Sequence, residues 1–133
     1  IEVKKGLFEL LNYAKSNNYK MAVATANPLE RAERYLKKIN AFSFFEKIIG
    51  GDMIQNGKPA PDIYITACHE IGLEPSECIA LEDSPNGVKA SYHAGCKTVM
   101  IPDLTQPDDD TKAMIYGLCG SLDEVIEILE REK

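Results

Sequence analysis

Residues 78–101 read CIALEDSPNGVKASYHAGCKTVMI, two short apolar runs separated by a helical stretch. The first run, Cys78–Asp83, is apolar until its last two residues, which is typical of a strand buried on both faces of a sheet. Ser84–Ala94 predicts a helix that stops at Gly95, and Lys97–Ile101 predicts the next strand. A strand, a helix and a second strand in this order indicate a right-handed βαβ unit with parallel strands.

The same alternation continues on both sides of this unit. Upstream, the sequence predicts a helix over residues 3–16, a strand over Lys20–Thr25, a helix with Asn27 as N-cap and Pro28 as first residue, a strand over Lys47–Gly50 and a helix over Asp62–Ile71. Downstream, it predicts a loop over 102–111, a short helix over 112–116 and a last helix that begins at Ser121, with Glu124 completing a capping box. We therefore expect one α/β domain, residues 1–133, with a parallel sheet.

Charge and cysteine spacing exclude several classes of protein. The net charge of −6 argues against binding along a nucleic-acid backbone, although one local cation or metal is enough to bind a small phosphate. No apolar run approaches the roughly 20 residues of a membrane span, and no signal peptide opens the chain. The four cysteines form no CxxC pair, which favours reduced thiols in a cytoplasmic protein over a zinc site. The chain opens on Ile1, so we interpret it as part of a longer protein.

Polar side chains follow three of the predicted strands. Thr25 ends the first strand and is followed by Ala26 and Asn27, whose backbone N–H groups could bind a phosphate at the start of a helix. Lys58 lies in the loop after the second strand, and the acidic pair Glu82-Asp83 closes the third. Because ligands bind outside the carboxyl ends of parallel strands, we expect these groups to share one edge of the sheet.

Each of these groups also has an ordinary structural interpretation. Thr25 could simply end its strand, Lys58 could be a solvated loop lysine, and Asp83 or Ser84 could cap the following helix. The combination is more specific than its parts. A hydroxyl, a lysine and a carboxylate pair at successive strand ends suit phosphoryl transfer, in which Mg²⁺ takes one or two carboxylates and a cation neutralises the phosphoryl oxygens.

Three segments, AVATANP, GKPAPDIY and LEDSPNGV, resemble motifs two, three and four of the haloacid dehalogenase superfamily, and most closely its β-phosphoglucomutase-like phosphatases. The resemblance implies a Rossmann-like three-layer α/β/α fold and a Mg²⁺-dependent phosphatase or phosphomutase that acts on a small phosphorylated metabolite. It assigns phosphate binding to Thr25, Ala26, Asn27 and Lys58, with Thr25 and Lys58 as catalytic residues. It assigns the metal to Glu82 and Asp83, and it gives Ser84 and Asn86 a supporting role in that loop.

The chain departs from the family in lacking the first strand, whose DxDGT motif carries the nucleophilic aspartate, and in lacking the cap domain. Its only similar stretch, Asp108-Asp109-Asp110-Thr111, follows no apolar strand, so we interpret it as a solvated acidic loop. In the family the missing strand is central in the sheet. We therefore expect a gap between the strands that carry Thr25 and Glu82-Asp83, with exposed apolar edges, and no activity from this chain alone.

Two other functions are compatible with parts of this pattern. A non-catalytic flavodoxin-like binding module, or a degenerate relative of the family, would also lack the nucleophile. A receiver-type signalling domain is set aside because its functional residues occur in a different order. Among the remaining polar and aromatic residues, we expect the histidines at the surface and Tyr64 and Tyr92 packed on the sheet. We expect the cluster Phe42, Phe44 and Phe45 in the core, with an exposed patch for a partner as the alternative.

Overall fold

The computed structural model describes residues 3–133, so Ile1 lies outside the described residues. Six α-helices are present: α1 (Leu7–Ser16), α2 (Leu29–Lys38), α3 (Asp62–Glu70), α4 (Pro85–Ala94), α5 (Asp109–Met114) and α6 (Val125–Arg131). Five strands lie between them: β1 (Ala22–Ala24), β2 (Lys47–Ile49), β3 (Ile79–Glu82), β4 (Lys97–Met100) and β5 (Gly117–Leu118). Every strand pair is parallel, which confirms the predicted α/β class.

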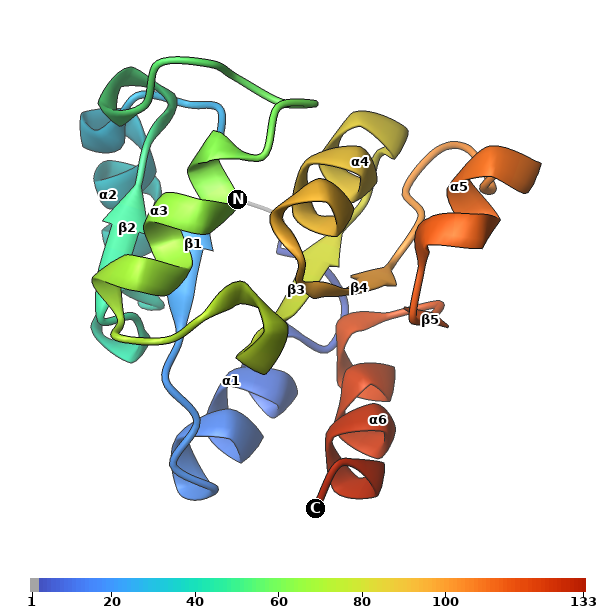
Figure 1. The fold of residues 1–133 in the computed structure, drawn as a ribbon. Coiled ribbons are helices and arrows are strands. Elements are labelled where there is room, and N and C mark those ends of the chain that lie inside the picture. Colours follow the sequence, from blue (N-terminus) through green and yellow to red (C-terminus); the bar gives the residue numbers. More distant parts are fainter. Residues whose placement is uncertain (1–2) are drawn as a thin grey trace.

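The strands form two separate sheets (Figure 1). In one, β1 pairs with β2, with Val23 opposite Ile48. In the other, the order is β3-β4-β5, with Leu81 opposite Val99. Within residues 3–133, β1 has no partner on its second side, and neither has β3. The split therefore falls where the sequence predicted a missing central strand.

Helices cover both faces of the strands, as expected for a three-layer α/β/α domain. On one face, Leu10 of α1 packs with Val125 of α6 against Val99, and Leu11 of α1 packs with Leu36 of α2. On the other face, α3 and α4 pack against alternate strand residues, in a cluster that consists of Ile49, Ile63, Tyr64, Ala67, Cys68, Ala80, Ala90 and Cys96. Because α1 and α3 contact both sheets, they hold the two parts of the molecule together.

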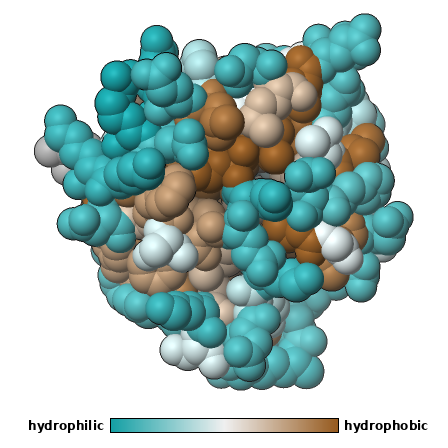
Figure 2. Space-filling view, turned by 90° about the vertical axis from the view of Figure 1, so that its left-hand side faces the viewer, coloured by the Kyte–Doolittle hydropathy of each residue, from teal (hydrophilic) through white to brown (hydrophobic). Residues whose placement is uncertain are grey.

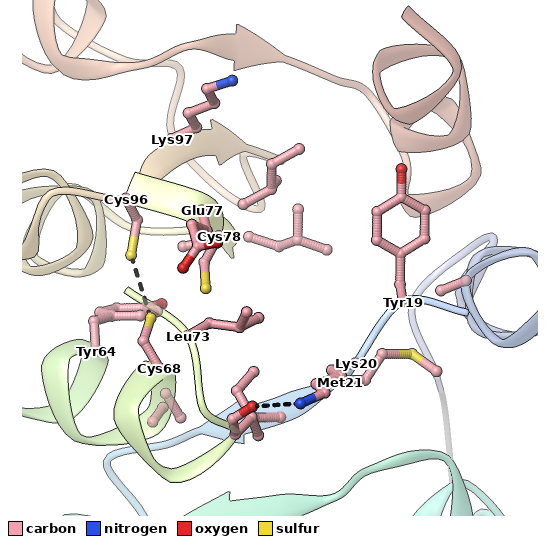
Figure 3. A pocket seen from close by; sticks show the side chains of 18 of the residues that line it. Tyr19, Lys20, Met21, Tyr64, Cys68, Leu73, Glu77, Cys78, Cys96 and Lys97 are labelled. Atoms are coloured by element: carbon pink, nitrogen blue, oxygen red, sulfur yellow. Dashed lines mark hydrogen bonds between the residues drawn. The ribbon is translucent and has the colours of Figure 1, made fainter. Parts of the chain in front are cut away.

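A cavity of about 630 Å³ lies between β1 and β3. It is lined by all three residues of β1, by Ile79–Leu81 of β3 and by residues of α1, α3 and α6. Figure 3 shows Tyr64, Cys68, Cys78 and Cys96 on the α3 side of this cavity. Each strand edge that faces this cavity lacks a partner within residues 3–133, as the sequence predicted, but the apolar residues of β1 and β3 are half-buried or buried rather than exposed.

Several predicted boundaries need correction. Helix α2 begins at Leu29, with Pro28 rather than Asn27 in the N-cap position. The acidic stretch is not a loop, because Asp108 caps α5 by accepting a hydrogen bond from the Thr111 N–H, so α5 begins earlier than residue 112. A short 3₁₀ helix, Leu122–Glu124, precedes α6, and the Glu124 carboxylate accepts from the Gly120 N–H instead of completing a box with Ser121.

The aromatic cluster lies beside α2. Phe42, Phe44 and Phe45 pack against the core formed by Leu11, Leu36 and Ala41, but each stays partly exposed. Viewed from the side of α2 and β2, the surface shows hydrophobic patches among hydrophilic residues (Figure 2). None of the helices in residues 3–133 combines the length and the apolar character that crossing a membrane requires.

Candidate active site

Lys58 and Glu82 form an ion pair at the carboxyl end of β3. The Lys58 Nζ lies 2.6 Å from Glu82 Oε2, and both side chains are largely buried, with 19% and 6% of their surfaces exposed. Two of the predicted site residues, 24 positions apart in sequence, are therefore in direct contact. Burying a carboxylate costs free energy unless a cation and further hydrogen bonds compensate its charge. The ion pair therefore holds the loop that carries Lys58 against the end of β3.

Tyr64 of α3 is a third member of this pair. Its hydroxyl donates to the same oxygen, Glu82 Oε2, and the Lys58 Nζ lies 5.3 Å from the centre of its ring. Burial, and then the negative charge of Glu82, raise the pKa of Tyr64 well above its usual range. The phenol therefore keeps its proton and acts only as a donor to the carboxylate. The sequence predicted the burial of Tyr64 but not this contact.

The loop that carries Lys58 is held by the first residue of α3. One oxygen of Asp62, Oδ2, accepts from both the backbone N–H and the side-chain amide of Asn56, each at 3.2 Å. Within the loop, the Ala60 N–H donates to the carbonyl of Gly57 at 3.0 Å. These contacts position Lys58 above Tyr64, and Asp62 is a supporting residue that the sequence did not single out.

Asp83 lies directly after Glu82 but in a different environment. Its side chain is 46% exposed and lies 3.8 Å from the Lys4 ammonium, which also lies 3.8 Å from Asp103. Next to it, Ser84 caps α4 by accepting from the Gly87 N–H at 3.2 Å, as one of the two interpretations of this stretch predicted. Asn86 lies exposed in the first turn of α4.

The turn after β1 carries the predicted phosphate-binding residues. Thr25 Oγ1 accepts from the Asn27 N–H at 3.1 Å, and the turn packs against the loop after β2, where the Gly51 N–H donates to the Asn27 carbonyl at 2.9 Å. Only glycine fits at position 51, because a β-carbon there would stand 2.3 Å from the Ala26 carbonyl oxygen. The next residue, Asp52, accepts from the Leu29 N–H at 2.9 Å and so stabilises the start of α2.

The structure thus joins Lys58 and Glu82, and it places Asp83, Ser84 and Asn86 just beyond them. Thr25, Ala26 and Asn27 follow β1, on the other side of the gap between the two sheets (Figure 1). Both groups lie at carboxyl ends of parallel strands, which is the edge where α/β folds bind ligands.

The fit of Mg²⁺ to these residues can be judged from their contacts. Glu82 already accepts from Lys58 and Tyr64 through one oxygen, whereas Asp83 is exposed and lies 3.8 Å from the Lys4 ammonium. In residues 3–133, no three acidic, histidine or cysteine side chains converge on a point that could hold a metal ion. Since Mg²⁺ often binds through one or two carboxylates, phosphate and water, Asp83 fits part of such a site.

Cys68, Cys78 and Cys96 line the cavity rather than this edge, whereas Cys119 is buried in the core beside α6. Cys68 and Cys96 are buried with their sulfur atoms 3.9 Å apart, and all four cysteines of the chain are reduced (Figure 3). Burial, and then a hydrogen bond with Cys68, raise the pKa of Cys78 to about 12, so this thiol stays protonated at neutral pH.

Comparison with known proteins identifies the family. Residues 1–101 match the family described as haloacid dehalogenase-like hydrolase. The chain belongs to this family.

Its relatives are haloacid dehalogenase-like phosphatases of the β-phosphoglucomutase-like subgroup. The phosphorylated carbohydrates phosphatase of Thermotoga maritima is 31% identical over 124 residues, which cover 93% of this chain and 56% of that protein. The validoxylamine A 7'-phosphate phosphatase of Streptomyces hygroscopicus is 36% identical over 120 residues, or 90% of this chain and 55% of that protein.

Solved structures agree with this assignment. CbbY from Rhodobacter sphaeroides, crystallised with phosphate, superposes with a TM-score of 0.83 at 32% identity, covering 92% of this chain and 55% of that one. The chain therefore spans about half the length of the haloacid dehalogenase-like relatives that it matches.

Proposed function

We propose that the full-length protein is a Mg²⁺-dependent phosphatase or phosphomutase that acts on a small phosphorylated metabolite, and most specifically on a phosphorylated sugar. The observation that carries this proposal is the buried Lys58–Glu82 ion pair at the carboxyl end of β3. It directs an ammonium group to the edge of the sheet where a phosphoryl group would bind. The T. maritima relative, named for phosphorylated carbohydrates, supports the substrate class.

The residues of this chain would act by position and charge. The Thr25 hydroxyl accepts from the Asn27 N–H, so its own proton is free to be donated to a phosphoryl oxygen. Lys58 would neutralise the oxygens that gain negative charge during transfer, which is the main requirement of phosphoryl transfer. Glu82 would hold the lysine ammonium in place, rather than bind the metal directly, because its Oε2 already accepts from Lys58 and Tyr64.

Asp83 would be the metal ligand of this chain, assisted through water by its neighbours. Bound Mg²⁺ would neutralise phosphate charge and fix the orientation of the phosphoryl group. Lys4, which carries the same sign of charge as Mg²⁺, lies 3.8 Å from Asp83 and would have to move away or share the carboxylate with the metal.

The nucleophile would come from a strand in the cavity between β1 and β3. A single parallel strand there would pair with both open edges and join the two sheets. Its carboxyl end would lie between Thr25 and Asp83, and the family resemblance places the nucleophilic aspartate at that point. Transfer would then pass through an aspartyl-phosphate.

The proposal is tested with the full-length protein on a set of phosphorylated sugars, by phosphate release with Mg²⁺ and with EDTA. Asp83→Asn should remove the Mg²⁺-dependent activity. Asp103→Asn is the matched control, because it also removes an acidic partner of Lys4 but lies outside the proposed metal site. Phosphate release that persists in EDTA or in Asp83→Asn would refute the metal assignment. A wild-type protein that releases no phosphate would favour the non-catalytic binding module.

A further inference from the structure

Within residues 3–133, three Lys–Glu–Tyr triads have a similar geometry. In each, a lysine ammonium and a tyrosine hydroxyl share one glutamate, and the ammonium lies over the ring of that tyrosine. The triads are Lys58–Glu82–Tyr64, Lys97–Glu132–Tyr116 and Lys133–Glu130–Tyr13, with lysine-to-carboxylate distances of 2.6, 2.6 and 2.7 Å. The ammonium-to-ring distances are 5.3, 5.1 and 5.6 Å.

The first triad differs from the others in its burial. Glu82 is 6% exposed and Tyr64 is 7% exposed, whereas Glu132 and Glu130 are 23% and 51% exposed. Water can replace a missing hydroxyl beside an exposed carboxylate. It has far less access to Glu82, so the second donor there has to come from the protein.

We propose that Tyr64 is a positioning residue of the phosphoryl-transfer site, an inference that rests on the proposed function. Its hydroxyl fixes the Glu82 carboxylate in one orientation, and Glu82 in turn holds the Lys58 ammonium. The ring lies beneath the ammonium and limits its movement from below. Tyr64 does not touch the substrate in this arrangement, because it acts only through Glu82 and Lys58.

The purely structural alternative is that Tyr64 satisfies a buried carboxylate and does nothing more. The two roles predict different kinetics. A positioning residue affects the transition state, in which a displacement of about 1 Å in a catalytic group can cost about a hundredfold in rate. A structural residue affects only the fraction of folded protein.

Tyr64→Phe separates the roles, since it removes the hydroxyl and keeps the ring. In the full-length protein, with the phosphorylated sugar that the wild type cleaves fastest, we expect kcat to fall about tenfold while KM changes less than about twofold. The melting temperature should stay above the assay temperature. Tyr116→Phe is the matched control, because it removes the same hydroxyl from an exposed triad, and its kcat should equal that of the wild type.

A second readout does not depend on turnover. Trace acetylation of lysines, followed by peptide mass spectrometry, reports how tightly each ammonium is held. Tyr64→Phe should raise the labelling of Lys58 at least about threefold, because a carboxylate that is free to rotate holds the ammonium less tightly. The acetylation of Lys97 in the Tyr116→Phe variant gives the change in labelling that is expected when only an exposed contact is lost.

The outcomes are distinguishable. A lower kcat together with higher Lys58 labelling supports the proposal. An unchanged kcat, whatever the labelling, overturns it, and so does a variant that melts below the assay temperature, because the hydroxyl then serves stability. A wild-type protein without phosphatase activity would refute the proposed function itself, and higher Lys58 labelling would then assign Tyr64 to the ion pair alone.

Discussion

Gly87 lies against the carboxylate of Glu82, so closely that a β-carbon at Gly87 would stand 1.8 Å from Glu82 Oε1. Lys58 and Tyr64 occupy the other oxygen of this carboxylate. The first turn of α4 therefore closes the site from the side opposite the lysine loop. A glycine at this position is required by close approach rather than by its backbone angles.

Gly87→Ala should displace the Glu82 carboxylate and break its contacts with Lys58 and Tyr64. We expect a loss of about 1–3 kcal/mol in the free energy of unfolding, measured in urea, because overpacking in a filled site costs this much. Turnover of the full-length protein should fall as well. Gly57→Ala is the control for stability, since a β-carbon at Gly57 meets no atom within 4 Å. Equal stability of the two variants would contradict the close packing of Glu82.

The Lys58–Glu82 pair should behave as one unit in a double-mutant cycle. Lys58→Met leaves a buried carboxylate with Tyr64 as its only remaining partner in the triad, and should cost roughly 3 kcal/mol of stability. Glu82→Gln removes the charge, so the double variant should recover part of this loss, with a coupling energy of about 1–3 kcal/mol in urea unfolding. Costs that add within about 0.5 kcal/mol would show that the two groups do not interact. Turnover of the full-length Lys58→Met variant should fall by about a hundredfold or more, even under conditions in which the variant stays folded.

Much of the fold could be predicted from the sequence because the strands are short apolar runs between amphipathic helices. The order of the predicted strands and the position of the gap follow from that pattern and from the family resemblance. The two-residue strand β5 was missed, since it is too short to show a period and forms only by pairing with β4. The predicted start of α2, at Pro28, is one residue too early. The N–H of Leu29, where the helix begins, donates to Asp52, and this partner lies 23 residues further along the chain, beyond the reach of a local capping pattern.

The sequence predicts the polar residues at the strand ends but not the tyrosine that contacts one of them. Thr25, Lys58 and Glu82-Asp83 stand out because polar groups at strand ends are conspicuous. Tyr64 does not stand out, because tyrosine is common on the apolar face of a helix. Its hydroxyl reaches Glu82 because α3 packs against β3, a contact that the sequence pattern does not show. Tyr92 was predicted to pack on the sheet, and this is wrong: it is 46% exposed and stacks edge-on against His93 at the surface.

Asp52 offers a test of how the proposed phosphate-binding turn after β1 is supported. Asp52→Ala should cost about 1 kcal/mol of stability in urea unfolding, because the Leu29 N–H at the start of α2 loses its acceptor. Asp52→Asn keeps an oxygen in the same place and should recover most of that loss. If both variants are equally destabilised, the charge of Asp52 matters rather than its hydrogen bond.

Asp108 gives the stability of this chain a specific dependence on pH. Its carboxylate accepts from the Thr111 N–H at 2.8 Å, and this hydrogen bond holds the pKa of Asp108 below its usual value. A folded-state pKa below the unfolded value, which is about 4, stabilises the protein above that pH. The contribution is lost as the pH falls through the lowered folded-state pKa.

Asp108→Ala should therefore lower the melting temperature at pH 7, and the difference from the wild type should narrow as the pH falls below about 4. Melting curves from pH 7 down to pH 3 measure this directly. Asp109→Ala is the control, because Asp109 lies in the first turn of α5 but does not occupy its N-cap position. A difference between Asp108→Ala and the wild type that stays constant with pH would show that the cap acts through the shape of the side chain and not through its charge.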